Sequence, residues 1–179
     1  VYDSVPQPQG PVLQAGSVEA IAAAERVIAG RRRPIEELSI INSTSGTTGL
    51  PKCVAHDERR WLKYHEYSVD AGALTNDEVC MSVVPAPFGF GLWTAHFTPT
   101  LIGAPTVVLP RFDVEQTLQM LEQEKVSVFM AVSTQFVMLL GHPDFDKFDL
   151  SALRVMYTGG EAVPYSKAEE FERRSGCCI

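Results

Sequence analysis

The stretch Leu38-Ser39-Ile40-Ile41-Asn42, followed by Ser43-Thr44-Ser45-Gly46-Thr47-Thr48-Gly49-Leu50-Pro51-Lys52, sets a short apolar run directly before a polar, glycine-containing segment. The apolar run predicts a β-strand. The ten residues after it carry five hydroxyl side chains, two glycines and one lysine. Glycines let the backbone approach an anion, and N–H, hydroxyl and ammonium groups donate to phosphate oxygens, so the segment predicts a phosphate-binding loop.

The spacing within this segment excludes the ordinary P-loop. A P-loop has four residues between its first glycine and a Gly-Lys pair that is followed by Ser or Thr, whereas Leu50 and Pro51 separate Gly49 from Lys52 here. A simple polar turn is the alternative interpretation, because clusters of Ser, Thr and Gly commonly form turns. On that interpretation Lys52 is an ordinary surface lysine.

Outward from this segment, short apolar runs alternate with longer amphipathic ones, as in βαβ units. We therefore predict an α/β fold with a mainly parallel sheet flanked by helices. We expect the phosphate loop to leave the end of the strand at 38–42, since ligands of open sheets bind at strand ends. The predicted strands are 38–42, 79–84, 106–109, 126–130 and 153–157, and the predicted helices are 58–71, 90–101, 114–124, 134–140 and 166–175. Asp113 is the predicted N-cap of the helix at 114–124, with Leu118 and Leu121 on its buried face.

Two segments differ in composition. Residues 1–37 begin with a Pro- and Gly-containing irregular lead-in and continue into one predicted helix at 17–30, whose N-cap would be Ser17. Residues 38–179 form the predicted α/β part. Because Cys177-Cys178-Ile179 resembles the start of a strand, we expect this domain to be truncated at its C-terminal end.

Composition narrows the classes of function. Fifteen basic and 22 acidic residues give a net charge of −7, which disfavours a dedicated nucleic-acid binder. Cys53, Cys80, Cys177 and Cys178 have neither the spacing of a disulfide scaffold nor that of a zinc site, so we expect a reduced, cytoplasmic protein and no metal ligands among them. Apolar runs stay shorter than the roughly 18 residues of a membrane span, which predicts a soluble protein.

The order of the motifs closely resembles that of the adenylate-forming superfamily, which comprises acyl-CoA synthetases, aryl-CoA ligases, adenylation domains of peptide synthetases, and luciferases. The loop at 43–52 resembles the phosphate loop of that superfamily. Residues 85–91 resemble its acyl-pocket turn, and residues 101–113 resemble the helix end, the strand and the next helix start. Residues 153–164 are similar to the strand and glycine turn beside adenine and the acyl group. The chain is thereby identified as part of the large N-terminal domain of an acyl-CoA synthetase or aryl-CoA ligase.

The resemblance implies that a carboxylate attacks the α-phosphate of ATP, which gives an acyl-adenylate and pyrophosphate, and that the acyl group then passes to CoA. It implies roles for three groups of residues. The phosphates are bound by Ser45, Gly46, Thr47, Thr48, Gly49 and Lys52, of which Thr47 and Lys52 act in catalysis. The nucleotide is bound by Gly159, Gly160 and Glu161, and the acid by Phe88, Phe90 and Trp93. The aromatic side chains have ordinary core packing as their alternative interpretation, and Glu161 could instead be the first-turn acid of a helix.

Some positions depart from the superfamily pattern. Phe88 stands where many members have His, Cys53 replaces a glycine, and Ser133 replaces a proline. His56 lies near a position where many relatives have His, and we interpret it as a structural or capping residue.

The superfamily's Tyr-Gly-x-Thr-Glu segment, ribose-binding aspartate, hinge and small C-terminal domain are expected outside these 179 residues. Ligands of Mg²⁺ are expected outside them too, and we predict that the chain alone lacks acid-dependent ATP turnover. Three alternatives stay open: a carrier-protein thiol as acceptor, oxygen as acceptor, or a non-catalytic nucleotide-binding relic of the same fold.

Overall fold

The computed structural model describes residues 18–31, 33–44, 46, 49–86 and 88–179. The chain divides into two compact units, with the boundary between Glu37 and Leu38. The described part of the first unit contains one helix, α1 (Val18–Ala29), which confirms the predicted helix. The proposed cap, Ser17, lies outside the described residues.

A four-stranded parallel sheet forms the centre of the second unit. Its strands are β4 (Thr106–Val107), β3 (Cys80–Ser82), β5 (Val128–Met130) and β6 (Val155–Tyr157), in that spatial order. Every pairing in this sheet is parallel, which confirms the predicted fold class. A further isolated parallel bridge joins Val155 of β6 to Cys178.

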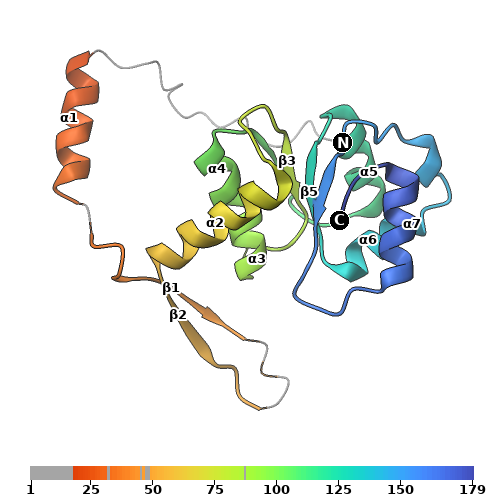
Figure 1. Ribbon diagram of the computed structural model, residues 1–179, viewed down its shortest axis with the longest axis horizontal. Helices are drawn as coiled ribbons and strands as arrows, with labels where there is room; N and C mark the ends of the chain where they lie inside the picture. The colour runs from red at the N-terminus through yellow and green to blue at the C-terminus, as the bar shows by residue number, and fades with distance from the viewer. Residues whose placement is uncertain (1–17, 32, 45, 47–48, 87) are drawn as a thin grey trace. The chain divides into compact units, whose positions relative to one another are not determined.

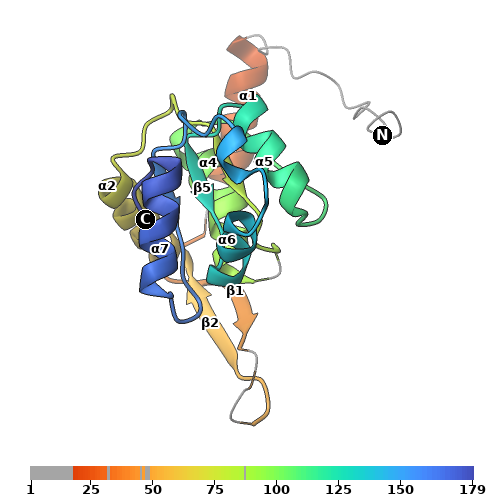
Figure 2. The same ribbon diagram turned by 90° about the vertical axis from the view of Figure 1, so that its right-hand side faces the viewer.

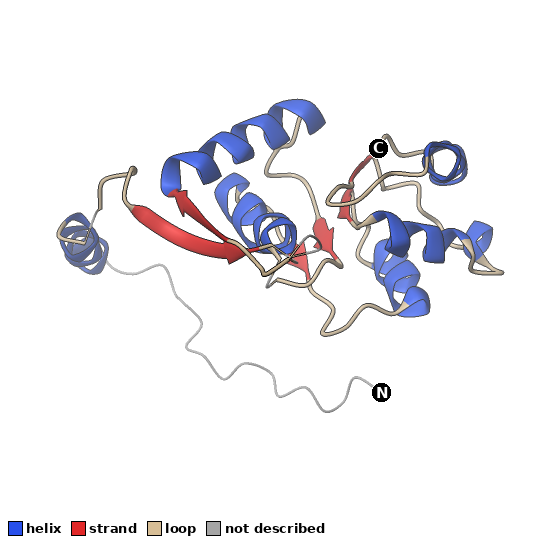
Figure 3. Cartoon of the chain, turned by 90° about the horizontal axis from the view of Figure 1, so that it is seen from below, coloured by secondary structure: helices blue, strands red, loops and turns tan. Residues whose placement is uncertain are grey.

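Helices cover both faces of this sheet (Figures 1 and 3). They are α2 (Glu58–Gly72), α3 (Gly89–Leu92), the π-helix η1 (Trp93–Phe97), α4 (Thr98–Ile102), α5 (Val114–Gln123), α6 (Ser133–Leu140), the 3₁₀ helix η2 (Phe145–Lys147) and α7 (Tyr165–Ser175). Side chains of a strand alternate between faces. One face of the sheet therefore packs against α5, α6 and α7 through Met81, Phe129 and Met156. The other face packs against α2, α3 and α4 through Cys80 and Val128.

Capping side chains fix where two of these helices begin. The Asp57 carboxylate accepts a hydrogen bond from the Arg60 backbone N–H at 3.0 Å, at the start of α2. The predicted cap of α5 is confirmed, because Asp113 accepts from the Gln116 N–H at 2.9 Å. The predicted buried face is confirmed as well, with Leu118 and Leu121 at 0% and 1% exposure.

The strand before the predicted phosphate loop differs from the prediction. β1 (Leu38–Ser43) pairs antiparallel with β2 (Cys53–Asp57) in a separate two-stranded sheet, so placing it in the parallel sheet was wrong. A parallel pairing needs a crossover of a dozen or more residues, whereas the short segment between β1 and β2 lets the chain turn back beside itself. Figure 1 shows the resulting hairpin apart from the central sheet.

The helix predicted at 90–101 is also different, because it is divided into α3, η1 and α4. Pro99 has no N–H and cannot donate to the carbonyl one turn earlier. The helix changes register just before it, where the Thr98 N–H donates to the Trp93 carbonyl. Within the described part of the chain, no helix is both long and apolar enough to cross a bilayer.

Candidate functional site

The loop between β1 and β2 depends on a glycine at position 46. Gly46 has φ +71°. A Cβ on this residue would lie 2.6 Å from the Gly49 carbonyl oxygen and 2.7 Å from the Pro51 nitrogen. The Gly49 N–H donates to the Gly46 carbonyl at 2.9 Å, which closes a tight turn. Only glycine fits this conformation and this spacing without displacing the backbone.

Two hydrogen bonds close the base of the same loop. The Thr44 N–H donates to the Lys52 carbonyl at 2.9 Å, and the Lys52 N–H donates to the Thr44 hydroxyl at 3.1 Å. Lys52 is exposed, so its ammonium group is accessible to an anionic ligand. Ser45, Thr47 and Thr48 lie outside the described residues, and their phosphate contacts stay predictions.

Two side chains connect the loops that follow β3, β5 and β6: Gln135, in the first turn of α6, and Glu161, which bonds to that first turn. Gln135 donates to the Val83 carbonyl at 2.7 Å and accepts from the Val132 N–H at 3.0 Å. The Glu161 carboxylate accepts from the Thr134 N–H at 2.9 Å and from the Thr134 hydroxyl at 3.2 Å. The carboxyl edge of the sheet, where ligands of such folds bind, is therefore held together by side chains.

The glycine turn after β6 is open on one side. Gly160 has φ +84°, and a Cβ built on Gly159 or Gly160 would meet no atom within 4 Å. Backbone at this turn is therefore accessible to a flat ligand group. Glu161 follows the turn and lies before α7 begins at Tyr165, so its interpretation as a first-turn acid of that helix was wrong.

Both the hairpin and the turn extend toward the same side of the second unit, the lower side in Figures 1 and 2. Contact of either segment with a ligand remains a prediction.

The three aromatic residues predicted to bind the acid have different surroundings. Phe88 is 61% exposed, and Phe90 packs against the core on the α2 side of the sheet. Trp93 stacks on Tyr64 with ring centroids 4.2 Å apart and meets Trp61 edge-on at 3.9 Å. The packing of Phe90 and Trp93 is that of core aromatics, and only Phe88 presents most of its surface to solvent.

His56 belongs to the same aromatic cluster. Its ring centroid lies 5.4 Å from that of Trp61 and 6.1 Å from that of Trp93. The cap of α2 is the neighbouring Asp57, so the capping interpretation of His56 was wrong and the structural one agrees with these contacts.

A cavity of about 360 Å³ lies at the carboxyl ends of β3 and β4. Pro85 and Ala86 from the predicted acyl-pocket turn line it, together with His96 from η1 and Arg111 from the segment after β4. Neither His96 nor Arg111 is among the residues predicted for a site. For His96 no local signal was available, because its direction depends on the register change in η1.

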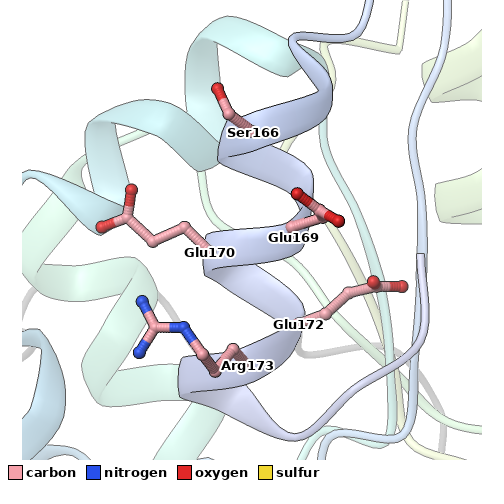
Figure 4. A pocket seen from close by; sticks show the side chains of 5 residues that line it. All are labelled: Ser166, Glu169, Glu170, Glu172 and Arg173. Atoms are coloured by element: carbon pink, nitrogen blue, oxygen red, sulfur yellow. The ribbon is translucent and has the colours of Figure 1, made fainter.

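Acidic side chains also gather on the outer surface of α7 (Figure 4). The side chains shown there are Ser166, Glu169, Glu170, Glu172 and Arg173. Glu170 pairs with Lys167 at 2.7 Å and with Arg174 at 3.3 Å, so its charge is compensated on the helix itself. In the described residues, no group of three or more His, Cys, Asp or Glu side chains is placed to hold a metal ion. We interpret this surface as a solvated helix face.

An ion pair with a buried carboxylate lies at the opposite end of the sheet. Arg154, just before β6, pairs with Glu78, just before β3, and donates to the Gly72 carbonyl at 2.6 Å. Burial favours a higher pKa for Glu78, but hydrogen bonds from Arg154 and Ser127 outweigh it and lower that pKa. Since it lies at the amino ends of the strands, this pair is a structural element and not part of the candidate site.

Comparisons with known proteins show what the chain is similar to. A family model described as AMP-binding enzyme matches residues 3–179. The chain is 29% identical over 149 residues to a long-chain-fatty-acid–CoA ligase of Bacillus subtilis, covering 80% of the chain and 26% of the relative. It is 34% identical over 136 residues to an indoleacetate–CoA ligase of Aromatoleum aromaticum, covering 75% and 26%. The chain thus spans about a quarter of the length of these relatives.

Two solved structures share the fold. The anthranilate CoA ligase AuaEII in complex with anthranoyl-AMP superimposes with a TM-score of 0.75 at 25% identity, over 81% of this chain and 29% of that one. ATP-bound MatB from Rhodopseudomonas palustris gives a TM-score of 0.72 at 23% identity, over 82% of this chain and 29% of that one.

Proposed function

Because the chain belongs to the AMP-binding enzyme family, we propose that the protein carrying it is an ATP-dependent carboxylic acid–CoA ligase. In this proposal the carboxylate of the acid attacks the α-phosphate of ATP, so that a P–O bond forms to the acid and the bond to pyrophosphate breaks. The thiol of CoA then displaces AMP from the acyl-adenylate. CoA is favoured as acceptor over a carrier protein or oxygen because the relatives described above are CoA ligases.

The loop between β1 and β2 is the observation that carries this proposal. A turn that requires Gly46, with an exposed Lys52 at its base, places a cation beside a loop whose backbone a phosphate can approach closely, a combination suited to the β- and γ-phosphates. Holding these phosphates positions the α-phosphate for attack and stabilises the negative charge that develops on pyrophosphate. We assign Ser45, Thr47, Thr48 and Gly49 to the same phosphates.

The remaining contacts are assigned to the carboxyl edge of the sheet. We propose that Gly159 and Gly160 lie against the nucleotide, since their outer side is open. The acid is proposed to enter beside the turn of Phe88, because Pro85 and Ala86 of this turn line the cavity of about 360 Å³. Phe90 and Trp93 would then stabilise the neighbouring turn through core packing and would not contact the acid.

Mg²⁺ normally accompanies ATP in this type of reaction. We propose that its protein ligands lie outside these 179 residues; in the described residues, no group of three or more His, Cys, Asp or Glu side chains is placed to hold a metal ion. We further propose a cytoplasmic location, where ATP and CoA are available and where the four cysteines, which are free in the structure, stay reduced.

The test is AMP and pyrophosphate release by the complete protein with short-chain, long-chain and aromatic carboxylic acids, with and without CoA. We expect release that depends on one class of acid and rises with CoA. Release that depends on an acid but is unaffected by CoA would favour another acceptor. No release with any acid would favour a nucleotide-binding relic.

A further inference from the structure

The Glu161 carboxylate joins two loops at the carboxyl edge of the sheet through its contact with Thr134. The carboxylate accepts two hydrogen bonds from Thr134, at 2.9 Å from the backbone N–H and 3.2 Å from the hydroxyl. Thr134 lies in the first turn of α6, and Glu161 directly follows the turn after β6. This contact therefore spans 27 residues of sequence and joins two neighbouring loops.

The chemistry of the contact favours a persistent link. The first N–H groups of a helix have no partner within the helix, and the helix dipole favours a negative charge there. A carboxylate at this place satisfies an N–H group that otherwise needs water. Both oxygens of Glu161 lie within reach of Thr134, since its second oxygen is 3.5 Å from the hydroxyl.

The link acts on the segment whose conformation matters for binding. Gly159 and Gly160 have no side chain to hold them, and no atom lies within 4 Å of the place where a Cβ would be. The turn would be loosely held without Glu161, and ordering it on binding would cost conformational entropy. The adjacent Gln135 provides the matching link to the loop after β3, through its 2.7 Å hydrogen bond to the Val83 carbonyl.

We propose that Glu161 is a positioning residue that clamps the glycine turn to the start of α6 and so preorganises the nucleotide site. This inference rests on the proposed function for the identity of the ligand. It replaces direct contact of Glu161 with the nucleotide by an action through Thr134 and the glycine turn.

Four variants of the complete protein test the clamp: Glu161→Ala, Glu161→Gln, Thr134→Val, and Glu161→Ala combined with Thr134→Val. Glu161→Ala is expected to raise the KM for ATP about tenfold, the size of one lost charge-assisted hydrogen bond, with little change in kcat. Glu161→Gln keeps an acceptor oxygen and is expected to recover part of the loss. Adding Thr134→Val to Glu161→Ala is expected to have no further effect, because the partner is already absent.

The hydrogen-exchange rate of the Thr134 amide reports on its contact with Glu161 in the absence of substrate. We expect Glu161→Ala to accelerate this exchange, whereas Glu124→Ala, which removes an exposed carboxylate at the end of α5, leaves it unchanged. Equal losses of kcat in Glu161→Ala and Glu161→Gln with unchanged exchange would overturn the clamp and indicate direct action on the substrate. An unchanged KM for ATP in Glu161→Ala would overturn it as well.

The two proposals can fail separately. Absence of acid-dependent AMP release from the unaltered protein would contradict the proposed function. The exchange of the Thr134 amide would then still decide whether Glu161 holds the two loops together.

Discussion

Removing the positive partner of the buried ion pair should destabilise the protein in a way that depends on pH. The Glu78 side chain is 7% exposed and the Arg154 side chain 39%. Arg154 also donates to the carbonyls of Gly72 and Ala73 at the end of α2. Arg154→Met keeps most of the packing volume but leaves the Glu78 carboxylate buried without its cation.

The expected loss follows from the burial of the two groups. Breaking a buried ion pair by removing one partner costs roughly 3–5 kcal/mol, and the partial exposure of Arg154 places this pair at the lower end, at about 3 kcal/mol. For a chain of this size about 1 kcal/mol lowers the Tm by roughly 2–4 °C, so we expect a decrease on the order of 6–12 °C. Glu78→Met combined with Arg154→Met should recover part of this loss, because no buried charge remains.

The pH dependence has a defined sign. In the unaltered protein the pKa of Glu78 is lowered below its usual 4.5, so the stability it contributes is present above that pH and is lost as the pH falls through the folded pKa. In Arg154→Met, burial without the cation raises the pKa of Glu78. The stability difference between the two proteins should therefore narrow as the pH is lowered.

Thermal unfolding measured between neutral pH and pH near 4 tests both expectations. Arg173→Met, which removes an exposed arginine from α7, serves as the matched control for the loss of one positive charge. A decrease in Tm no larger than that of the control would refute the assigned role of the pair. A Tm difference between Arg154→Met and the unaltered protein that grows toward acid pH would refute it as well.

Three further substitutions have defined outcomes. Gly46→Ala forces φ +71° on a residue whose Cβ would lie 2.6 Å from the Gly49 carbonyl oxygen. We therefore expect the KM for ATP to rise about tenfold with little change in Tm, and an unchanged KM would contradict the loop geometry. Gly91→Ala places a Cβ 2.3 Å from the Pro85 carbonyl in a buried position, so urea unfolding should show a loss of about 2–3 kcal/mol; an unaltered midpoint would be inconsistent with this packing. Lys52→Ala should lower the rate of the chemical step roughly 10²–10³-fold, while the KM for the acid changes little. Pre-steady-state kinetics measures that rate, and an unchanged rate would remove Lys52 from the site.

Much of the central sheet could be predicted because its two inner strands, β3 and β5, are buried on both faces. The run 126–130 is almost entirely apolar and follows two charged residues, which leaves few alternatives to a buried parallel strand. Helix starts with a side-chain cap, such as Asp113, were predictable for the same local reason. The positions of Leu118 and Leu121 follow from helical periodicity alone.

Where the prediction failed, the deciding interaction was not local. The sequence of β1 is apolar in either type of sheet, and its partner β2 contains His56 and Asp57, so the pattern did not identify a strand there. The break in the helix at 90–101 depends on how the chain compensates for Pro99, which sequence periodicity does not express. The contact between Glu161 and Thr134, on which its proposed positioning role rests, joins residues 27 apart in sequence and has no local signal either.

Acid-dependent exchange of labelled pyrophosphate into ATP, measured on the complete protein without CoA or any other thiol, tests the central claim most directly. Reversible formation of an acyl-adenylate predicts exchange that requires the acid and is lost in Lys52→Ala. The same result would hold whichever thiol accepts the acyl group. Exchange that is absent with every acid, or cleavage of ATP to ADP and phosphate in its place, would contradict the account.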